Sequence, residues 1–353
     1  MLRVGIIGAS GYAGGELARL LQAHPEVTIT FLGSETYAGK PFSKAFPGAA
    51  GTALGRLVCE KPEAAQAAEN ADVLFLAGES GVAMRSAADL LEKRKRVIDI
   101  SADFRIRDAA LYEATYKIPH QAAGLLQSGA AVYGLPELNR EKIRCAQLIA
   151  NPGCFPTATV LGLAPLLKAG LIGTQGIVVD AKSGVSGAGR AKSDLALRYS
   201  EANETVVPYG VGGIHRHVPE IEQELSVVAP SSVTITFTPH RVPMTRGLLA
   251  TCYAPLTRPD LTTTDILEAL NTAYADTPFV VVRDAGEQPS TKDVYGSNFC
   301  HVAAVVDPRT KTVIVTSVID NLVKGAAGQA VQNMNLMLGL SETAGLEGGG
   351  IWP

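Results

Sequence analysis

The chain has 353 residues, of which 46% are hydrophobic and 18% are charged, so it is long enough for two domains with well-filled cores. Its formal net charge is −3 and its lysines and arginines are scattered, which argues against a protein that binds nucleic acid. No apolar stretch reaches the roughly 18 residues of a membrane span, so we expect a cytoplasmic protein without a signal peptide or a membrane anchor.

The N-terminal residues predict a strand, a glycine-rich turn and a helix. Leu2–Ile7 is a short apolar run typical of a buried parallel strand, and Gly15–Leu21 opens a helical pattern. Between them, glycines at positions 8, 11 and 14 allow the backbone to turn tightly and to approach a pyrophosphate at the helix N-terminus. We expect the dinucleotide to be bound here by Gly8, Ser10, Gly11, Tyr12 and Ala13.

The end of the second strand, Val27–Leu32, bears on the choice of cofactor. NAD enzymes place an acidic residue here for the ribose 2′-hydroxyl, whereas NADP enzymes offer hydroxyls and cations to a 2′-phosphate. Ser34 and Thr36, with lysines downstream, favour NADP, but Glu35 favours NAD. We expect NADPH, and the sequence leaves the alternative open.

Further strands and helices alternate up to residue 150. Apolar runs predict strands at Val73–Ala77, Val97–Ile100 and Leu148–Ala150, with a helix near Met84–Glu92. This alternation predicts an α/β domain with a doubly wound parallel sheet over residues 1–150.

The following 170 residues are richer in β-structure. Helical patterns occur at Val218–Leu225 and Thr264–Tyr274, and the intervening runs predict a mixed or antiparallel sheet with helices on one face, forming a domain over residues 151–320. The predicted strands include Gly176–Ala181, Ser232–Phe237, Gly247–Tyr253, Val302–Val306 and Val313–Val318. Asn321–Leu340 predicts a helix, within residues 321–353, that packs back on the first domain.

Cys154 is the strongest candidate for a catalytic residue. Pro156 suits the first turn of a helix, and apolar residues follow at helical spacing from Thr157, although we expect Pro165 to kink or break that helix. A helix N-terminus favours a thiolate over a thiol, which makes Cys154 a candidate nucleophile. The alternative is a small buried apolar residue. The five cysteines are widely spaced, which argues against disulfides and against a zinc site.

Two histidines are candidates for the proton shuttle. His215 and His217 are two residues apart, so only one of them can easily face Cys154. We favour His217, which is nearer to the helix that Pro219 begins, and keep His215 as the alternative. Glu220 either orients the histidine or is an ordinary acidic residue of a first helical turn.

Cationic residues on two loops are candidates for binding the substrate. Arg105 offers a guanidinium for a phosphate or a carboxylate, or else it forms an ion pair with Asp103 or Asp108. The small-residue run from Ser183 and Gly184 to Arg190, followed by Lys192, either forms an anion nest for a leaving phosphate or is a flexible surface loop.

Seven motifs in order along the chain resemble those of N-acetyl-γ-glutamyl-phosphate reductases, which are related to aspartate-semialdehyde dehydrogenases. The motifs are GASGYAG (8–14), DISADFR (99–105), YGLPELN (133–139), NPGCFPT (151–157), SGVSGAGR (183–190), GIHRHVPEI (213–221) and NLVKGAAGQAVQNMN (321–335). The resemblance implies a Rossmann domain, a second domain like that of glyceraldehyde-3-phosphate dehydrogenase, NADPH, and a homodimer or homotetramer. It also implies reduction of a small-molecule acyl phosphate to a semialdehyde through a Cys154 thioester in arginine biosynthesis, with Asn321 and Lys324 bordering the nicotinamide.

Two other functions remain open at this point. One is reduction of a carrier-protein-linked aminoadipyl or glutamyl phosphate, which would need a broad cationic face for an acidic carrier, whereas this chain is mildly acidic overall. The other is a non-catalytic regulator that binds a nucleotide, against which the cysteine and the two histidines argue.

Overall fold

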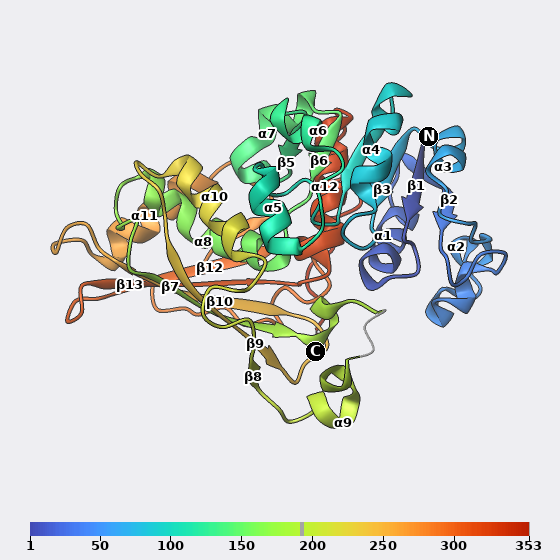
Figure 1. The fold of residues 1–353 in the computed structure, drawn as a ribbon. Coiled ribbons are helices and arrows are strands. Elements are labelled where there is room, and N and C mark those ends of the chain that lie inside the picture. Colours follow the sequence, from blue (N-terminus) through green and yellow to red (C-terminus); the bar gives the residue numbers. More distant parts are fainter. Residues whose placement is uncertain (191–193, 353) are drawn as a thin grey trace. The chain divides into compact units, whose positions relative to one another are not determined.

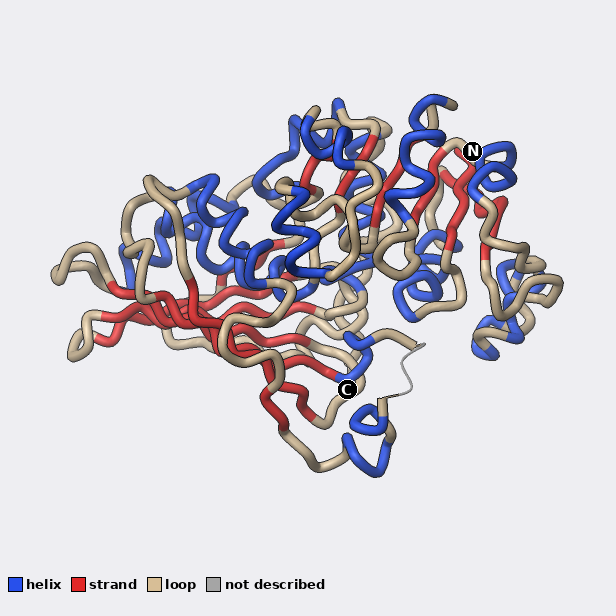
Figure 2. Tube along the Cα trace, in the orientation of Figure 1, coloured by secondary structure: helices blue, strands red, loops and turns tan. Residues whose placement is uncertain are grey.

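The computed structural model describes residues 1–190 and 194–352, which form two compact units. The first unit consists of Met1–Pro152, residues 189–190 and Ala326–Glu347, and the second consists of residues 153–188, 194–325 and 348–352. Figure 1 labels the helices and strands, and Figure 2 distinguishes them by colour. Each unit is built around one β-sheet.

The first unit contains a six-stranded parallel sheet with the strand order β2-β1-β3-β4-β6-β5. Its strands are β1 (Leu2–Ile7), β2 (Val27–Gly33), β3 (Val73–Leu76), β4 (Arg96–Asp99), β5 (Ala131–Tyr133) and β6 (Leu148–Ala150). Because helices cover both faces, central strands such as β3 are buried along their whole length. The predicted doubly wound parallel sheet is therefore confirmed.

Helices of the first unit lie in two layers. One layer contains α1 (Tyr12–Gln22), α7 (Pro136–Cys145) and α12 (Gly328–Met337), and the other contains α3 (Ala64–Asn70) and α4 (Ala83–Glu92). Shorter helices are α2 (Ala53–Arg56), α5 (Ala109–Tyr116) and α6 (Ala123–Gln127). Since β1 lies between β2 and β3, the strand order reverses at β1, and ligands of such sheets bind at the carboxyl ends of the strands at this point.

The second unit contains a seven-stranded mixed sheet with the order β11-β12-β13-β10-β7-β9-β8. The pairs β7–β9 and β11–β12 are parallel and the other neighbours are antiparallel. Its strands are β7 (Ile177–Gly184), β8 (Val207–Pro208), β9 (Ile235–Val242), β10 (Leu248–Pro255), β11 (Val280–Val282), β12 (Cys300–Asp307) and β13 (Thr312–Ile319).

One face of this second sheet is covered by α8 (Cys154–Lys168), α10 (Val218–Val228) and α11 (Thr263–Tyr274), as Figure 1 shows. A short helix, α9 (Tyr199–Ala202), lies in the long segment between β7 and β8. The predicted mixed sheet with helices on one face is confirmed. Among the helices of residues 1–190 and 194–352, none has the length and hydrophobicity needed to span a membrane.

The expectation that Pro165 breaks its helix is wrong. Helix α8 continues through Pro165 to Lys168. A proline removes the N–H that would bond to the carbonyl four residues earlier, which here is the carbonyl of Leu161. The hydroxyl of Tyr274 in α11 donates to that Leu161 carbonyl instead. A side chain from a neighbouring helix thus satisfies the carbonyl that the proline leaves unpaired.

The C-terminal helix begins differently from the prediction. A π-helical segment, Val323–Ala327, precedes α12, and the Asp320 side chain lies at the start of this segment. Asp320 Oδ1 accepts hydrogen bonds from the N–H groups of Leu322 (2.8 Å) and Val323 (3.2 Å). Helix α12 is buried along its length and packs against α1 and α7 of the first unit.

Candidate active site

Cys154 is the first residue of α8, and Gly153 is its N-cap. The strand β6 ends four residues before Cys154, so the chain passes directly from a buried strand into the helix that carries the thiol. Gly325 packs against the cysteine so closely that a Cβ at position 325 would lie 2.8 Å from the Cβ of Cys154. The thiol is half-buried, at the end of a helix where a thiolate is favoured.

Glu220 holds the helix end that carries Cys154. Its carboxylate is fully buried, and Oε1 accepts a hydrogen bond of 2.9 Å from the N–H of Gly153. The residue lies in the first turn of α10, as predicted, and its bond to Gly153 joins α10 to the start of α8. A buried charge-assisted bond of this kind fixes the backbone at the nucleophile. The structure therefore gives Glu220 a positioning role toward Cys154.

The two histidines lie in a cluster of aromatic rings beside Phe155. The His215 ring lies 5.6 Å from Phe155, 5.2 Å from Phe237 and 4.9 Å from His217, measured between ring centroids. His215 Nδ1 accepts a hydrogen bond of 3.1 Å from the backbone N–H of His217. Burial, together with the nearby Arg216, lowers the pKa of His215 to about 4. His215 is therefore neutral at physiological pH and is held as an acceptor, which suits a structural role.

His217 is the histidine at the helix end. It is the N-cap residue of α10, is 5% exposed, and its ring centroid lies 5.9 Å from that of Phe155, the residue after the nucleophile. Both histidine rings therefore lie beside Phe155, and the expectation that only one of them can face Cys154 stays a prediction.

Two residues of this site were missed by the sequence analysis. Tyr209 lies 5.4 Å from the His215 ring, and Arg241 Cζ lies 5.9 Å from the centre of the Tyr209 ring. Burial raises the pKa of Tyr209, and the negative charge of Cys154 raises it further, so the hydroxyl lies within electrostatic reach of the thiolate. The sequence analysis ended the predicted strand at Phe237, whereas β9 continues to Val242 and so includes Arg241.

The first residues of the loop after β7 are packed into the protein, whereas Gly187, Gly189 and Arg190 are exposed. Ser183 and Ser186 are buried, and residues 185–188 form a 3₁₀ turn. The N–H groups of Gly184, Val185 and Ser186 donate to the carbonyls of Gly247, Met244 and Thr245. These three amides are therefore engaged within the protein, and an anion nest built from them is wrong. The Ser183 hydroxyl donates to the Gly184 carbonyl at 3.2 Å.

Asn321 joins this loop to β10. Its Oδ1 accepts from the N–H of Gly247 at 2.8 Å, and its Nδ2 donates to Ser186 Oγ at 2.9 Å. Both ends of the amide are thus used within the second unit. Lys324 is fully buried, with Nζ 5.7 Å from the centre of the Phe279 ring. The predicted residue Lys192 lies outside the described residues.

Arg105 belongs to the first unit and is 8% exposed. Its Nε donates to the carbonyl of Asn151 at 2.7 Å, and its Nη2 donates to the carbonyl of Ile100 at 2.8 Å. These bonds hold the guanidinium between the ends of β4 and β6. Carboxyl ends of parallel strands are where ligands bind in sheets of this type.

The glycine-rich turn fits a dinucleotide. Gly8 has a φ of +91°, and a Cβ there would lie 2.5 Å from the carbonyl oxygen of Ala77. Gly14 allows equally close packing, since its Cβ would lie 2.3 Å from the carbonyl oxygen of Gly8. Gly11 is the N-cap of α1 and offers no side chain to the helix end. A pyrophosphate can therefore approach this backbone and the helix N-terminus.

Hydroxyl and cationic groups gather at the end of β2. Ser10 Oγ lies 2.8 Å from Ser34 Oγ. Arg190 donates to the carbonyl of Ser10 at 3.1 Å, and its guanidinium lies over the rings of Phe46 (4.8 Å) and Tyr37 (5.8 Å). Arg190 therefore contacts the nucleotide-binding end, where the sequence analysis had not placed it.

The first unit also holds one buried amide that no protein group uses. Gln329 of α12 is fully buried, and neither its Nε2 nor its Oε1 has a hydrogen-bond partner among the described residues. Such a group offers one donor site and one acceptor site to a bound molecule.

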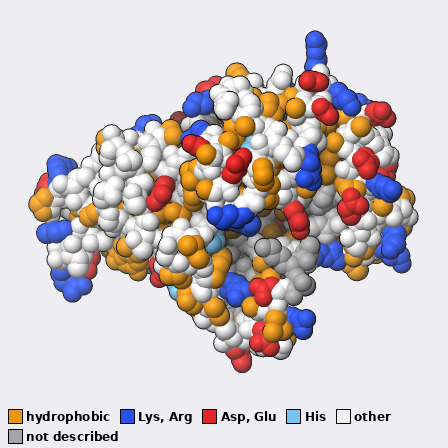
Figure 3. Space-filling view, viewed as in Figure 1, with side chains coloured by type: hydrophobic (Ala, Val, Ile, Leu, Met, Phe, Trp, Pro, Cys, Tyr) orange, Lys and Arg blue, Asp and Glu red, His pale blue; other side chains and the backbone are white. Residues whose placement is uncertain are grey.

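Within residues 1–190 and 194–352, no group of three His, Cys, Asp or Glu side chains could hold a metal ion. On the face shown in Figure 3, Lys and Arg side chains are interspersed with Asp and Glu.

Two family models match the chain. The model described as the NAD binding domain of semialdehyde dehydrogenase matches residues 3–146, and the one described as the semialdehyde dehydrogenase dimerisation domain matches residues 154–321. The first unit is thus a nicotinamide-cofactor domain by family.

Solved structures of similar fold include two aspartate semialdehyde dehydrogenases. Enzyme II of Vibrio cholerae has a TM-score of 0.72 and 19% identity, covering 96% of this chain and 98% of that one. The Candida albicans enzyme, solved with NADP, has a TM-score of 0.65 and 16% identity, with coverage of 96% and 98%. These likenesses show the fold.

Curated relatives are much more similar in sequence. The chain is 54% identical over 349 residues to the N-acetyl-gamma-glutamyl-phosphate reductase of Geobacter sulfurreducens, covering 99% of both chains. It is 50% identical over 354 residues to the enzyme of that name from Symbiobacterium thermophilum, covering 100% of this chain and 99% of the relative. Identity at this level over the full length is decisive, and the chain belongs to the N-acetyl-gamma-glutamyl-phosphate reductase family.

Proposed function

We propose that the protein reduces N-acetyl-glutamyl 5-phosphate to N-acetyl-glutamate 5-semialdehyde with release of phosphate, using NADPH, as a step of arginine biosynthesis. The observation that carries the proposal is the arrangement at the start of α8. Cys154 is the first helical residue, Glu220 holds the Gly153 N–H, and His217 begins the adjoining α10. The names of the full-length relatives support the same reaction.

The reaction proceeds through a covalent bond to Cys154. The thiolate attacks the acyl carbon, an S–C bond forms, the C–O bond to the phosphate breaks, and phosphate leaves with its electron pair. Bound NADPH supplies the hydride that reduces the thioester carbon. The S–C bond then breaks, which releases the semialdehyde and restores the thiolate.

His217 moves the proton in this scheme. An imidazole nitrogen of His217 donates a proton to the oxygen that becomes negative during reduction, and takes it back as the carbonyl re-forms. His215 is unsuited because its lowered pKa keeps it neutral and its Nδ1 is already an acceptor. Glu220 is assigned to holding the backbone beside Cys154, through its bond to the Gly153 N–H.

The groups that bind the anions of the substrate and of the cofactor are assigned residue by residue. Arg105 is assigned to the substrate, together with the Ser183 hydroxyl. The cofactor lies along Gly8, Ser10, Gly11, Tyr12 and Ala13. The cations and hydroxyls at the end of β2, above all Arg190 and Ser34, are assigned to the 2′-phosphate of NADPH, since a guanidinium binds phosphate well. Gln329 is assigned to the nicotinamide amide, because both groups offer one donor and one acceptor.

We further propose that the protein is a homodimer or a homotetramer. The description of the family model that matches residues 154–321 as a dimerisation domain supports this. Light scattering at two protein concentrations distinguishes the two assemblies from a monomer.

The reaction is tested in the reverse direction, with semialdehyde, phosphate and NADP, using N-acetylglutamate, aspartate and aminoadipate semialdehydes in parallel. We expect NADPH to form with the first. Cys154→Ser should abolish turnover and leave NADPH binding, measured by fluorescence, unchanged. Retention of even a tenth of the wild-type rate by Cys154→Ser would contradict the covalent route. Turnover of aminoadipate semialdehyde alone would favour the carrier-linked reductase.

A further inference from the structure

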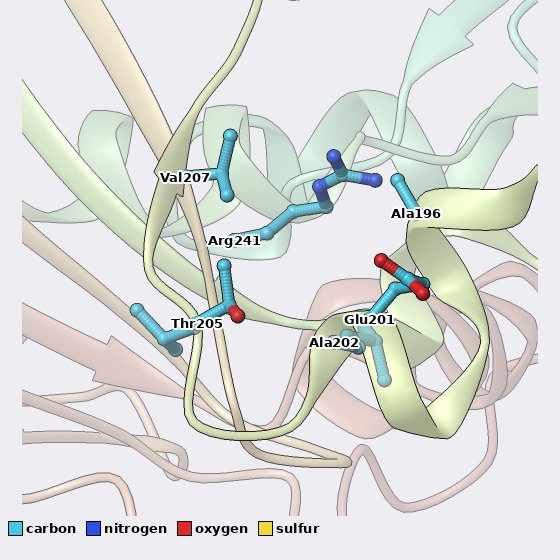
Figure 4. Close-up of a pocket in the computed structure, with 8 residues that line it drawn as sticks. Ala196, Glu201, Ala202, Thr205, Val207 and Arg241 are labelled. Atoms are coloured by element: carbon cyan, nitrogen blue, oxygen red, sulfur yellow. The ribbon is translucent and has the colours of Figure 1, made fainter.

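A cavity of about 320 Å³ lies in the second unit beside the loop after β7. Figure 4 shows it between the α9 segment and the strands β8 and β9. Six of its lining residues are Ala196, Glu201, Ala202, Thr205, Val207 and Arg241. A volume of this size lies at the lower end of the range of small-molecule sites, roughly 300–1,000 Å³.

Three polar side chains point into this cavity from different elements. Figure 4 shows the guanidinium of Arg241 on β9, the carboxylate of Glu201 on α9, and the side chain of Thr205 between α9 and β8. The remaining wall is aliphatic. The cavity therefore presents a cation, an acidic acceptor and a hydroxyl within an apolar surface, which is the composition of a site that orients a small polar ligand.

The Arg241 guanidinium keeps most of its binding capacity. Its nearest acidic partner is Asp194, whose Oδ2 lies 3.8 Å from Nη1. The Asp194 side chain is 57% exposed, so water screens this pair and it contributes little. Arg241 itself is only 23% exposed, and a planar guanidinium has five N–H donors. A carboxylate that enters the cavity can bind to it in two hydrogen bonds.

This cavity adjoins the nucleophile through Tyr209. Arg241 Cζ lies 5.9 Å from the centre of the Tyr209 ring, the Tyr209 ring lies 5.4 Å from the His215 ring, and the His215 ring lies 5.6 Å from that of Phe155, the residue after Cys154. The register of β7 and β9 also pairs Arg241 with Ser183, next to the loop assigned to the substrate. Contacts through Tyr209 and His215 thus connect the cavity wall to the residue that follows Cys154.

We infer that the cavity binds the N-acylated amino-acid end of the substrate while the acyl phosphate lies at Cys154. Arg241 binds the α-carboxylate, Glu201 accepts the amide N–H, and Ala202 with its aliphatic neighbours contacts the acyl methyl group. This inference rests on the proposed function. It implies that residues of α9 make the enzyme specific for a substrate with an acylated amino group over one with a free amino group. A free α-amino acid, bound with its ammonium at Glu201, is the competing occupant.

The test compares three aldehydes in the reverse reaction. N-acetylglutamate semialdehyde has both groups, 5-oxopentanoate lacks the acetamido group, and 4-acetamidobutanal lacks the α-carboxylate. Arg241→Lys should lower kcat/KM about ten- to a hundredfold for the two aldehydes that have the carboxylate, because one of two charge-assisted bonds is lost. For 4-acetamidobutanal the change should stay below about threefold.

Ala202→Leu should affect a different pair of aldehydes from Arg241→Lys. This difference shows that the effect of Arg241→Lys is not a general loss of activity. By filling the acyl end, it should lower kcat/KM about tenfold or more for the two acetamido aldehydes and spare 5-oxopentanoate. Glu201→Gln should follow Ala202→Leu in its pattern. Glu204→Gln, an exposed carboxylate in the same segment that does not line the cavity, is the matched control and should change none of the three.

Two results would overturn the inference. One is an equal loss for all three aldehydes in Arg241→Lys and Ala202→Leu, which would make both residues structural. The other is calorimetric binding of free glutamate, but not of N-acetylglutamate, in a manner that Arg241→Lys removes; this would assign the cavity to a free amino acid. Failure of the wild-type protein to use any of the aldehydes would instead overturn the proposed function.

Discussion

Asp99, the last residue of β4, should make the stability of the protein depend on pH in an unusual direction. Its carboxylate is fully buried, Oδ1 accepts from the N–H (2.8 Å) and the hydroxyl (2.6 Å) of Ser101, and Oδ2 has no hydrogen-bond partner among the described residues. Burial, and then the charge of the buried Asp103, raises its pKa from 3.8 to about 7, although Ser101 and Arg105 oppose the change.

The direction of this pH dependence follows from the number of protons that Asp99 binds in the native and in the unfolded state. Between the unfolded pKa of 3.8 and the native pKa of about 7, the native state binds more protons at Asp99 than the unfolded state does. The free energy of unfolding contributed by this group therefore falls as the pH rises through that window, and the loss is complete above the native pKa. The difference is roughly three pKa units at about 1.4 kcal/mol each, so the loss is at most about 4 kcal/mol.

Asp99→Asn should remove this dependence, because an amide keeps the Oδ1 acceptor for Ser101 and carries no charge. We expect the stability of the variant relative to wild type to increase by up to about 4 kcal/mol between about pH 4 and about pH 8, measured by urea unfolding at each pH. The exposed carboxylate variant Asp284→Asn is the control and should show no such trend. A constant difference between Asp99→Asn and wild type across this range would refute the reasoning.

Three further predictions concern the cofactor, the substrate and the fold. The wild-type protein should have a higher kcat/KM with NADPH than with NADH, and equal kcat/KM values would contradict the assignment of Arg190. Arg190→Ala should lower kcat/KM about tenfold or more with NADPH and leave it unchanged with NADH, since a charged bond to the 2′-phosphate is worth about 1.5–3 kcal/mol. Arg105→Lys should lower kcat/KM for the acyl phosphate roughly ten- to a hundredfold with unchanged NADPH affinity; early melting with normal kinetics would instead make Arg105 structural. Tyr274→Phe should lower the free energy of unfolding by about 1–3 kcal/mol. The loss should be smaller in a Pro165→Ala background, where a backbone N–H again bonds to the Leu161 carbonyl. Identical losses in both backgrounds would show that the Tyr274 hydroxyl does not replace the N–H that Pro165 lacks.

Features set by neighbouring residues were predictable from the sequence. Apolar runs such as Val73–Leu76 can only be buried strands of a parallel sheet, and Gly8 occupies a turn where a Cβ has no space. Cys154 at a helix start followed from Gly153 and Pro156, because capping and the first turn depend on residues within a few positions. The fold class and the nucleophile's setting were therefore determined by local chemistry.

Only the tertiary structure decided which distant groups meet. Glu220 bonds to Gly153 across 67 residues, Arg190 bonds to Ser10 across 180, and Tyr274 compensates for a proline in another helix. The position of Arg241 in a cavity wall and the raised pKa of Asp99 likewise depend on what surrounds these residues in space. The periodicity of apolar residues indicates which face of a helix or strand is buried. A buried polar group, however, is stabilised or perturbed by partners that the packing of whole helices and strands brings close to it. This packing cannot be predicted from any short stretch of sequence.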